Sequence, residues 1–280
     1  MTPRVGIMQG RLVPPEEGRF QSFPAQRWRD EFARARAAGL HCIEWIFDKP
    51  FEARNPIAYD ACLAEMQALV AETGVAVSSI CADYYMDCRL VTPSGRPDRV
   101  VQDHLLWLIE RASRLGVTYI VLPFVDASSL GTHEQRAALG AALAPALPRA
   151  LEHHIELHLE TDLAPPDLGA VLRRLDHPAL KANYDIGNSA SLGYDPEEEL
   201  SVIGARLGSV HVKDRLRGGG TVPLGTGSAD LAAAFRMIRR IGFDRWLVLQ
   251  VAREEAADHV SVARRNRETV ERLWSQATTA

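Results

Sequence analysis

Four polar residues at the ends of apolar segments have side chains of the types that bind a divalent metal ion. They are Glu160 after IELHL, Asp185 after LKANY, His211 within SVHVKD and Gln250 after WLVL. Together they supply one imidazole nitrogen and several carboxyl or amide oxygens, which suits Mg²⁺, Mn²⁺ or Co²⁺, admits Zn²⁺, and differs from a structural thiolate zinc site. The four residues are far apart in sequence, so the fold has to bring them together.

The elements that would position these residues alternate regularly along the chain. Eight short apolar runs are VGIMQ, CIEWIF, VAVSSIC, TYIVLP, IELHLE, LKANYD, SVHVKD and WLVLQV. Between them lie amphipathic segments such as 26–38, 57–72, 98–115 and 134–153, and a last helix is expected at about 254–275. This alternation predicts an α/β protein, a (β/α)₈ TIM barrel in a single domain over residues 1–280.

Composition limits the classes of partner. The 280 residues are 46% hydrophobic, which is enough to bury a large core, and the net charge of -4 gives no basic surface for nucleic acid. Small polar molecules are therefore the expected partners. The sequence has no run of about 18 apolar residues and no leader with a charged and then an apolar region, so we expect no membrane association and no export.

The cysteines indicate a reducing environment. Cys42, Cys62, Cys81 and Cys88 form no CxxC pair, and four thiols in a chain of this length do not suggest a disulfide scaffold. We expect reduced and mostly buried thiols in a cytoplasmic protein.

The predicted barrel would bring the four candidate ligands to one place, because active sites of TIM barrels lie at the C-terminal ends of the strands. Side chains alternate between the two faces of a strand. The residues that share a face in this way are Glu156, His158 and Glu160, then Ser209, His211 and Lys213, and Asn183 with Asp185. Such inward polar groups are costly unless they are paired or bind a metal. The alternative is that Glu160 and Asp185 cap helices and His211 is a hydrogen-bonded core histidine.

These residues resemble the sugar isomerase and epimerase superfamily that has the xylose isomerase-like TIM barrel. This superfamily includes ketose 3-epimerases, hydroxypyruvate isomerase, inosose dehydratase and endonuclease IV. The resemblance extends over nearly the whole chain, through IMQGRL, GLHCIEWIFD, ICADYYMD, HLETDL, YDIGNS, HVKDR, VPLGTG and LVLQVAR. It implies that strands five to eight supply the metal ligands, which correspond here to Glu160, Asp185, His211 and, by position, Gln250.

One ligand departs from the family pattern, in which the last ligand is usually Glu rather than Gln250. The family's epimerases are understood to use carboxylates of the fifth and eighth strands on opposite faces of the substrate. An amide oxygen can bind a metal but cannot take up and return a proton. Glu160 would then act as a single base between neighbouring carbons, unless a second residue replaces the missing carboxylate. The candidates for that second group are His158, Lys213, Asp83 and Glu254.

Further residues are placed to hold a polyol. Asn188 lies three residues after Asp185, where related epimerases have a substrate-contacting side chain, and Arg215 and Arg217 follow His211 into the next loop. The segment GGGTVPLGTGSAD offers backbone amides in the region where barrels often bind phosphate, which makes a sugar phosphate one of the expected substrates. The other candidates are Arg253 after Gln250, Gln9 and Arg11 after the first strand, Glu44 and Asp48 from the second, and Asp83 after the third.

The sequence thus predicts a divalent-metal-dependent isomerase or epimerase of a sugar or sugar phosphate, which acts by proton transfer next to a carbonyl through an enediolate. Glu160 would be both ligand and base, with Lys213 or Arg215 as an electrostatic aid. The alternatives are a keto-polyol (inosose-type) dehydratase and a catalytically silent metal-dependent sugar-binding protein. Nuclease activity is not expected, because the remaining histidines fall mainly in predicted helices or loops. The resemblance also allows a homo-oligomer.

Overall fold

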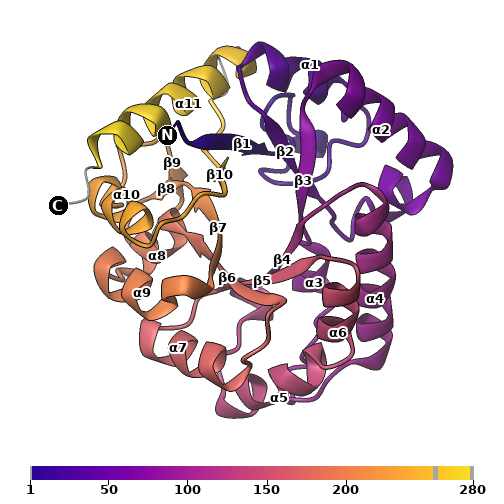
Figure 1. Cartoon of the computed structure of the whole chain (residues 1–280), viewed down its shortest axis with the longest axis vertical. Helices are drawn as coiled ribbons and strands as arrows, with labels where there is room; N and C mark the ends of the chain where they lie inside the picture. Colours follow the sequence, from indigo (N-terminus) through magenta and orange to yellow (C-terminus); the bar gives the residue numbers. More distant parts are fainter. Residues whose placement is uncertain (1, 255–257, 278–280) are drawn as a thin grey trace.

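The computed structural model describes residues 2–254 and 258–277. Within them, eight parallel strands form a closed barrel surrounded by helices (Figure 1). In order around the barrel, the strands are β1 (Arg4–Met8), β2 (Cys42–Ile46), β3 (Ala76–Cys81), β4 (Tyr119–Phe124), β5 (Glu156–Thr161), β6 (Leu180–Asp185), β7 (Leu207–Val212) and β10 (Trp246–Leu249). β1 closes the barrel by pairing with β10. The predicted (β/α)₈ barrel is confirmed, and each apolar run forms one strand.

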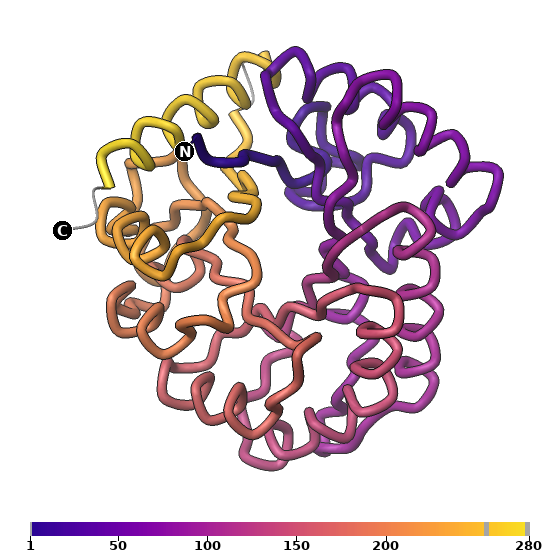
Figure 2. The backbone as a smooth tube through the Cα atoms, in the orientation of Figure 1, coloured from indigo at the N-terminus to yellow at the C-terminus, as the bar shows by residue number. Residues whose placement is uncertain are grey.

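Helices cover the outside of the barrel. They are α1 (Asp30–Ala37), α2 (Asp60–Thr73), α3 (Tyr84–Asp87), α4 (Arg99–Arg114), α5 (His133–Leu143), α6 (Ala146–Glu152), α7 (Pro165–Arg174), α8 (Ile186–Leu192), α9 (Pro196–Ile203), α10 (Leu231–Arg240) and α11 (His259–Gln276). Five 3₁₀ turns lie at Glu16–Gly18, Glu52–Arg54, Pro56–Ala58, Asp126–Ser128 and Gly204–Arg206 of the described chain. The chain makes one circuit, so that α11 returns to the N-terminal strand (Figure 2).

Two segments differ from the sequence-based expectation. The predicted helix 134–153 is two helices, α5 and α6, because Pro145 has no backbone N–H to continue the hydrogen-bonding pattern. The Gly-rich segment after β7 is an antiparallel hairpin of β8 (Asp214–Arg215) and β9 (Thr221–Val222). The predicted last helix begins at His259, and residues 255–257 of that prediction lie outside the described residues.

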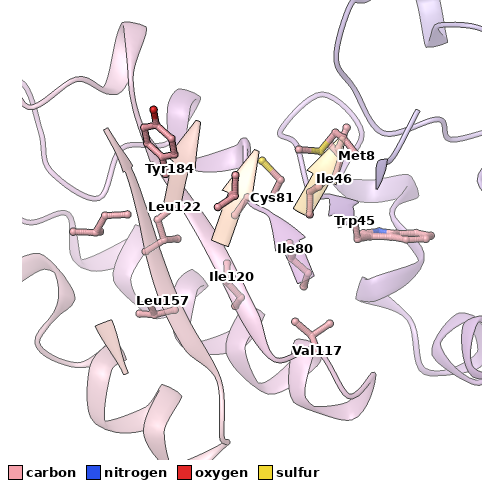
Figure 3. Packing of buried hydrophobic residues seen from close by; sticks show 14 of the residues in the cluster. Met8, Trp45, Ile46, Ile80, Cys81, Val117, Ile120, Leu122, Leu157 and Tyr184 are labelled. Carbon is pink, nitrogen blue, oxygen red and sulfur yellow. The ribbon is translucent and has the colours of Figure 1, made fainter. Parts of the chain in front are cut away.

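The main hydrophobic core lies between the barrel and its helices. Figure 3 shows buried apolar side chains of neighbouring strands packed close together, among them Ile80 of β3 and Ile120 of β4. Trp45 of β2 is fully buried, and its ring lies 6.2 Å from that of Phe32 on α1. The residues that alternate with these apolar positions are therefore directed into the barrel.

The barrel interior contains a chain of hydrogen-bonded polar side chains. His158 Nδ1 lies 2.8 Å from Ser209 Oγ, which donates to Asn183 Oδ1 at 2.7 Å. Asn183 Nδ2 lies 3.2 Å from His211 Nδ1, and His211 Nε2 lies 2.6 Å from Glu44 Oε1. All five residues are buried. The predicted inward face of β5, β6 and β7 is thus confirmed, and its polar groups have partners.

In the described part of the chain, no helix combines the length and the apolar character needed to cross a membrane. The four cysteines are free thiols, of which Cys42 and Cys81 are buried.

Candidate metal and substrate site

Three of the four predicted ligands lie together at the C-terminal ends of adjacent strands. Glu160, Asp185 and His211, from β5, β6 and β7, each place one ligand atom within 4.8 Å of the others. His211 Nδ1 is 3.7 Å from Glu160 Oε2 and 3.9 Å from Asp185 Oδ2. All three side chains are buried. One nitrogen and two carboxylate oxygens at this spacing can hold a divalent metal ion.

The other nitrogen of His211 is held by a carboxylate. Glu44 of β2 lies inside the barrel, where its Oε1 contacts His211 Nε2 at 2.6 Å and its Oε2 accepts a hydrogen bond from Ser79 Oγ at 2.7 Å. Burial disfavours the charged imidazole, but Glu44, together with Glu160 and Asp185, outweighs burial and raises the pKa of His211 to about 9. Glu44 therefore orients the ring and leaves Nδ1 facing the two carboxylates.

Glu160 has the properties of a general base. Its burial raises the pKa from 4.5 to about 7, a shift that His211 and Lys213 oppose and Asp185 reinforces. Asn188 Nδ2 donates a hydrogen bond to Glu160 Oε1 at 2.9 Å and so fixes the orientation of the carboxyl group. A carboxyl group with a pKa near neutrality can both accept and return a proton at neutral pH.

Lys213 lies among the ligand candidates. Its Nζ donates to Asp185 Oδ2 at 3.2 Å, to Asn188 Oδ1 at 3.1 Å and to Gln250 Oε1 at 3.1 Å. The oxygen of Gln250 is thus directed at an ammonium group. The described residues fit a metal ion through three ligands, while Gln250 as a fourth ligand stays a prediction.

A cavity of about 220 Å³ lies beside these residues at the mouth of the barrel. The predicted site residues that line it are Glu160, Lys213, Gln250, Asn188, Arg215 and Asp83. Arg215 is held in place by donating to Asn188 Oδ1 at 2.9 Å and to the Gly219 carbonyl at 3.0 Å. Two carboxyl groups, two cations and two amides of the predicted site therefore face the same small space.

Four other predicted site residues lie away from this cavity. His158 lies inside the barrel between Ser209 and Glu156, and Gln9 is fully buried with its Oε1 accepting a hydrogen bond from the Ile46 N–H. Burial lowers the pKa of His158, which favours its neutral form. These contacts give no support to a catalytic role of His158 or to substrate contact by Gln9, and both stay predictions.

The arginines Arg253 and Arg217 also point elsewhere. Arg253 donates to the carbonyl groups of Phe20 and Val13 and so fastens the loop after β1. Arg217 packs its guanidinium against Gly193 beside a separate cavity of about 250 Å³. Neither residue lines the cavity next to Glu160, so direct substrate contact by them is not supported.

Gln21, in the loop after β1, was not identified from the sequence. Its Oε1 accepts hydrogen bonds from Gln250 Nε2 and Arg11 Nη2, both at 3.0 Å, and its Nε2 donates to Asp83 Oδ2 at 2.8 Å. Gln21 lines the cavity and connects the end of β10 to the end of β3. A glutamine in an irregular loop carries no pattern that would have marked it as part of the site.

The backbone amides expected to bind phosphate have another partner. Asp214 Oδ2 accepts from the amides of Gly225 and Gly227, both at 2.9 Å, and its Oδ1 accepts from the amide of Ala229 at 3.1 Å. Asp214 is fully buried. The prediction that this segment offers free amides to a substrate phosphate is therefore wrong for these three, because a carboxylate of the same chain already fills the anion-binding turn.

The fold and site can be compared with known proteins. Among solved structures, IOLI protein with a bound zinc atom is 14% identical to this chain, with a TM-score of 0.76 and coverage of 100% of both chains. A xylose isomerase-like TIM barrel protein from Mycobacterium smegmatis in complex with magnesium is 18% identical, with a TM-score of 0.70 and coverage of 99% of this chain and 98% of that chain. D-allulose 3-epimerase from Methylomonas sp. in complex with D-allulose is 17% identical, with a TM-score of 0.71 and coverage of 97% of each chain.

At these identities the structural likeness shows the fold alone, and no curated protein is significantly similar to the chain in sequence. A family model provides the assignment. The model described as xylose isomerase-like TIM barrel matches residues 32–273, which is most of the chain and includes the strands that carry Glu160, Asp185 and His211. The chain therefore belongs to the xylose isomerase-like TIM barrel family.

Proposed function

We propose that the protein is a divalent-metal-dependent isomerase or epimerase that moves a proton next to the carbonyl group of a sugar. The observation that carries this proposal is the buried group of Glu160, Asp185 and His211, whose member Glu160 lines a cavity of about 220 Å³. A buried carboxyl group with a pKa of about 7, which is one of three side chains that can bind one cation, suits proton abstraction from a carbon acid.

Glu160, Asp185 and His211 would hold the metal ion, with Gln250 as a neutral fourth ligand. When bound, a divalent ion would polarise the substrate carbonyl as a Lewis acid. The oxygen and nitrogen ligands suit Mn²⁺, Mg²⁺ or Co²⁺. Because Lys213 also donates to Asp185 and Gln250, its ammonium contributes to neutralising the same carboxylate.

Glu160 would take the proton from the carbon next to the carbonyl. Asn188 fixes this carboxyl group through its amide nitrogen, while its amide oxygen accepts hydrogen bonds from Lys213 and Arg215. The base and the two cations are therefore held at defined positions around one side chain. The cations can attract the substrate oxygens on which negative charge develops as the proton leaves.

The substrate class that fits best is a sugar without a phosphate group. The polar lining supplies hydrogen-bond donors and acceptors for hydroxyl groups, and a cavity of about 220 Å³ is small. The amides of Gly225, Gly227 and Ala229 are engaged by Asp214, which removes the main argument for a phosphorylated sugar. A single domain over residues 1–280, a cytoplasmic location and a homo-oligomer remain predictions from the sequence.

The experiment that tests this function is proton NMR in D₂O on a panel of ketoses, ketose phosphates and inososes, with Mn²⁺ or Mg²⁺ added. We expect deuterium to enter at the carbon next to the carbonyl of an unphosphorylated ketose. Glu160→Gln should abolish this exchange, while Glu152→Gln, which changes an exposed carboxylate on α6, should exchange at the wild-type rate. Full activity of Glu160→Gln would refute the assigned base. Loss of water from the substrate would indicate a dehydratase, and sugar binding without deuterium exchange would indicate a binding protein.

A further inference from the structure

Inversion at a carbon requires a second acid/base group on the face opposite the first base. The end of β10 cannot supply it, because Gln250 is an amide. Among the other candidates, His158 lies in the barrel interior, and Glu254 pairs with Arg265 in an exposed ion pair at 2.8 Å. Lys213 donates to Asp185, Asn188 and Gln250, so that all three of its N–H groups already have acceptors. Besides Glu160, the carboxyl groups of the described residues that line the cavity are those of Asp83 and Asp126.

Asp83, which follows β3, lines the same cavity as Glu160. Its Oδ2 accepts a hydrogen bond from Gln21 Nε2 at 2.8 Å, and its Oδ1 accepts one from Cys81 Sγ at 3.2 Å. The oxygen of the same Gln21 amide accepts from Gln250 Nε2 at 3.0 Å. The carboxyl group of Asp83 thus lies one amide group away from Gln250 at the end of β10.

The surroundings of Asp83 favour exchange of a proton. Burial raises its pKa, and the hydrogen bonds from Gln21 and Cys81 lower it. The two hydrogen bonds also fix the orientation of the carboxyl group. Asp126 lines the cavity as well, but no side chain of the described residues holds it in a corresponding way. Asp83 is therefore a carboxyl group held beside the substrate space and separate from the metal-binding cluster.

We infer that Asp83 is the second acid/base of a two-base epimerase, so that the carboxylate absent from β10 is supplied from β3. The inference rests on the proposed function. The Glu160 carboxylate takes the proton from the carbon next to the carbonyl, and the C–H electron pair moves to form the enolate of the substrate. The Asp83 O–H then gives its proton to the opposite face of that carbon, and the electron pair of the enolate forms the new C–H bond. Glu160 ends protonated, Asp83 ends ionised, and exchange with water restores both.

The test compares Asp83→Asn with Asp87→Asn, a control that removes an exposed carboxylate from the adjacent helix α3. Two rates are measured by NMR in D₂O: formation of the epimer, and entry of deuterium into recovered substrate. We expect Asp83→Asn to lose epimer formation by at least about 100-fold, as for loss of a general acid, while exchange into substrate through Glu160 continues. Asp87→Asn should match the wild type in both rates. Persistent exchange also shows that the variant is folded and binds substrate.

A measurement on the unaltered protein gives an independent test. With two bases, the first epimer formed in D₂O should carry deuterium at the inverted carbon in full, because its new hydrogen comes from Asp83. Three results would overturn this inference and leave the proposed function intact. They are an epimer that retains the original hydrogen, a product formed only by a shift between neighbouring carbons, and unchanged epimer formation in Asp83→Asn. Absence of exchange from every sugar in the wild type would overturn both.

Discussion

Replacement of Glu44 by Gln tests whether the metal site depends on a residue that does not itself bind the metal. Glu44 is fully buried and contacts His211 Nε2 at 2.6 Å. A Gln side chain has the same shape, and its oxygen can still accept a hydrogen bond from that nitrogen. The substitution therefore removes the negative charge behind the imidazole and keeps the packing.

The size of the effect follows from the charge that Glu44 supplies. The pKa of His211 rises from 6.5 to about 9 against the opposing effect of burial, which corresponds to about 3 kcal/mol in favour of positive charge on the ring. Because burial opposes this rise and Glu160 and Asp185 contribute to it, the value is the net effect of several groups and not the share of Glu44 alone. Carboxylates that orient a ligating histidine typically change metal affinity by about 10- to 100-fold. We expect Glu44→Gln to weaken Mn²⁺ binding within that range.

The assay is calorimetric titration of Mn²⁺ into metal-free protein, with free Mn²⁺ followed in parallel by electron paramagnetic resonance. Glu65→Gln serves as the control, because it removes a half-exposed carboxylate of α2 that pairs with Arg29 at the surface. Thermal unfolding of both variants checks that the barrel remains folded. An affinity of Glu44→Gln within about twofold of the wild type would refute the reasoning, since the orienting carboxylate would then have no influence on the metal.

Two further predictions concern the same cluster. Gln250→Glu should tighten Mn²⁺ binding by at least about tenfold, because an added charge near a dication is worth several kcal/mol even at an effective dielectric constant of about 20. An unchanged Mn²⁺ affinity in the titration would mean that residue 250 is not a ligand. Without metal, the folded state keeps a proton on Glu160 up to about pH 7, whereas the unfolded state loses this proton near pH 4.5. The free energy of unfolding should therefore fall as the pH rises from 5 to 8, by up to about 3 kcal/mol. Urea unfolding should show a smaller fall for Glu160→Gln, and equal falls would contradict the assignment.

The sequence was sufficient to predict the barrel and the grouping of Glu160, Asp185 and His211, because both follow from regular patterns. Eight apolar runs with helical segments between them define the strands, and the period of two along β5 and β7 places Glu160 and His211 on inward faces. Parallel strands end at the same edge of the barrel, so residues at corresponding strand ends meet. The position of this cluster could thus be predicted without knowledge of side-chain contacts.

Other parts of the site depend on long-range contacts that no local pattern records. Glu44 was expected only to reach the mouth from β2, yet it binds His211, which is 167 positions away in sequence. Gln21 joins Gln250 to Asp83 from an irregular loop. Arg253 lies three residues after Gln250, a predicted ligand, but its side chain turns to the carbonyl groups of a neighbouring loop. Proximity in sequence to a predicted ligand therefore did not predict the direction in which a side chain points.

The carboxylate of Asp214 competes with any anion from solution for the backbone amides of its own loop. It belongs to the chain whose amides it binds, so its effective concentration at Gly225, Gly227 and Ala229 is of the order of millimolar or higher and cannot be diluted. A phosphate group from solution would have to displace it and leave a buried charge without partners, which is strongly unfavourable. The amides of Gly225, Gly227 and Ala229 are therefore closed to anions from solution as long as the Asp214 carboxylate holds them.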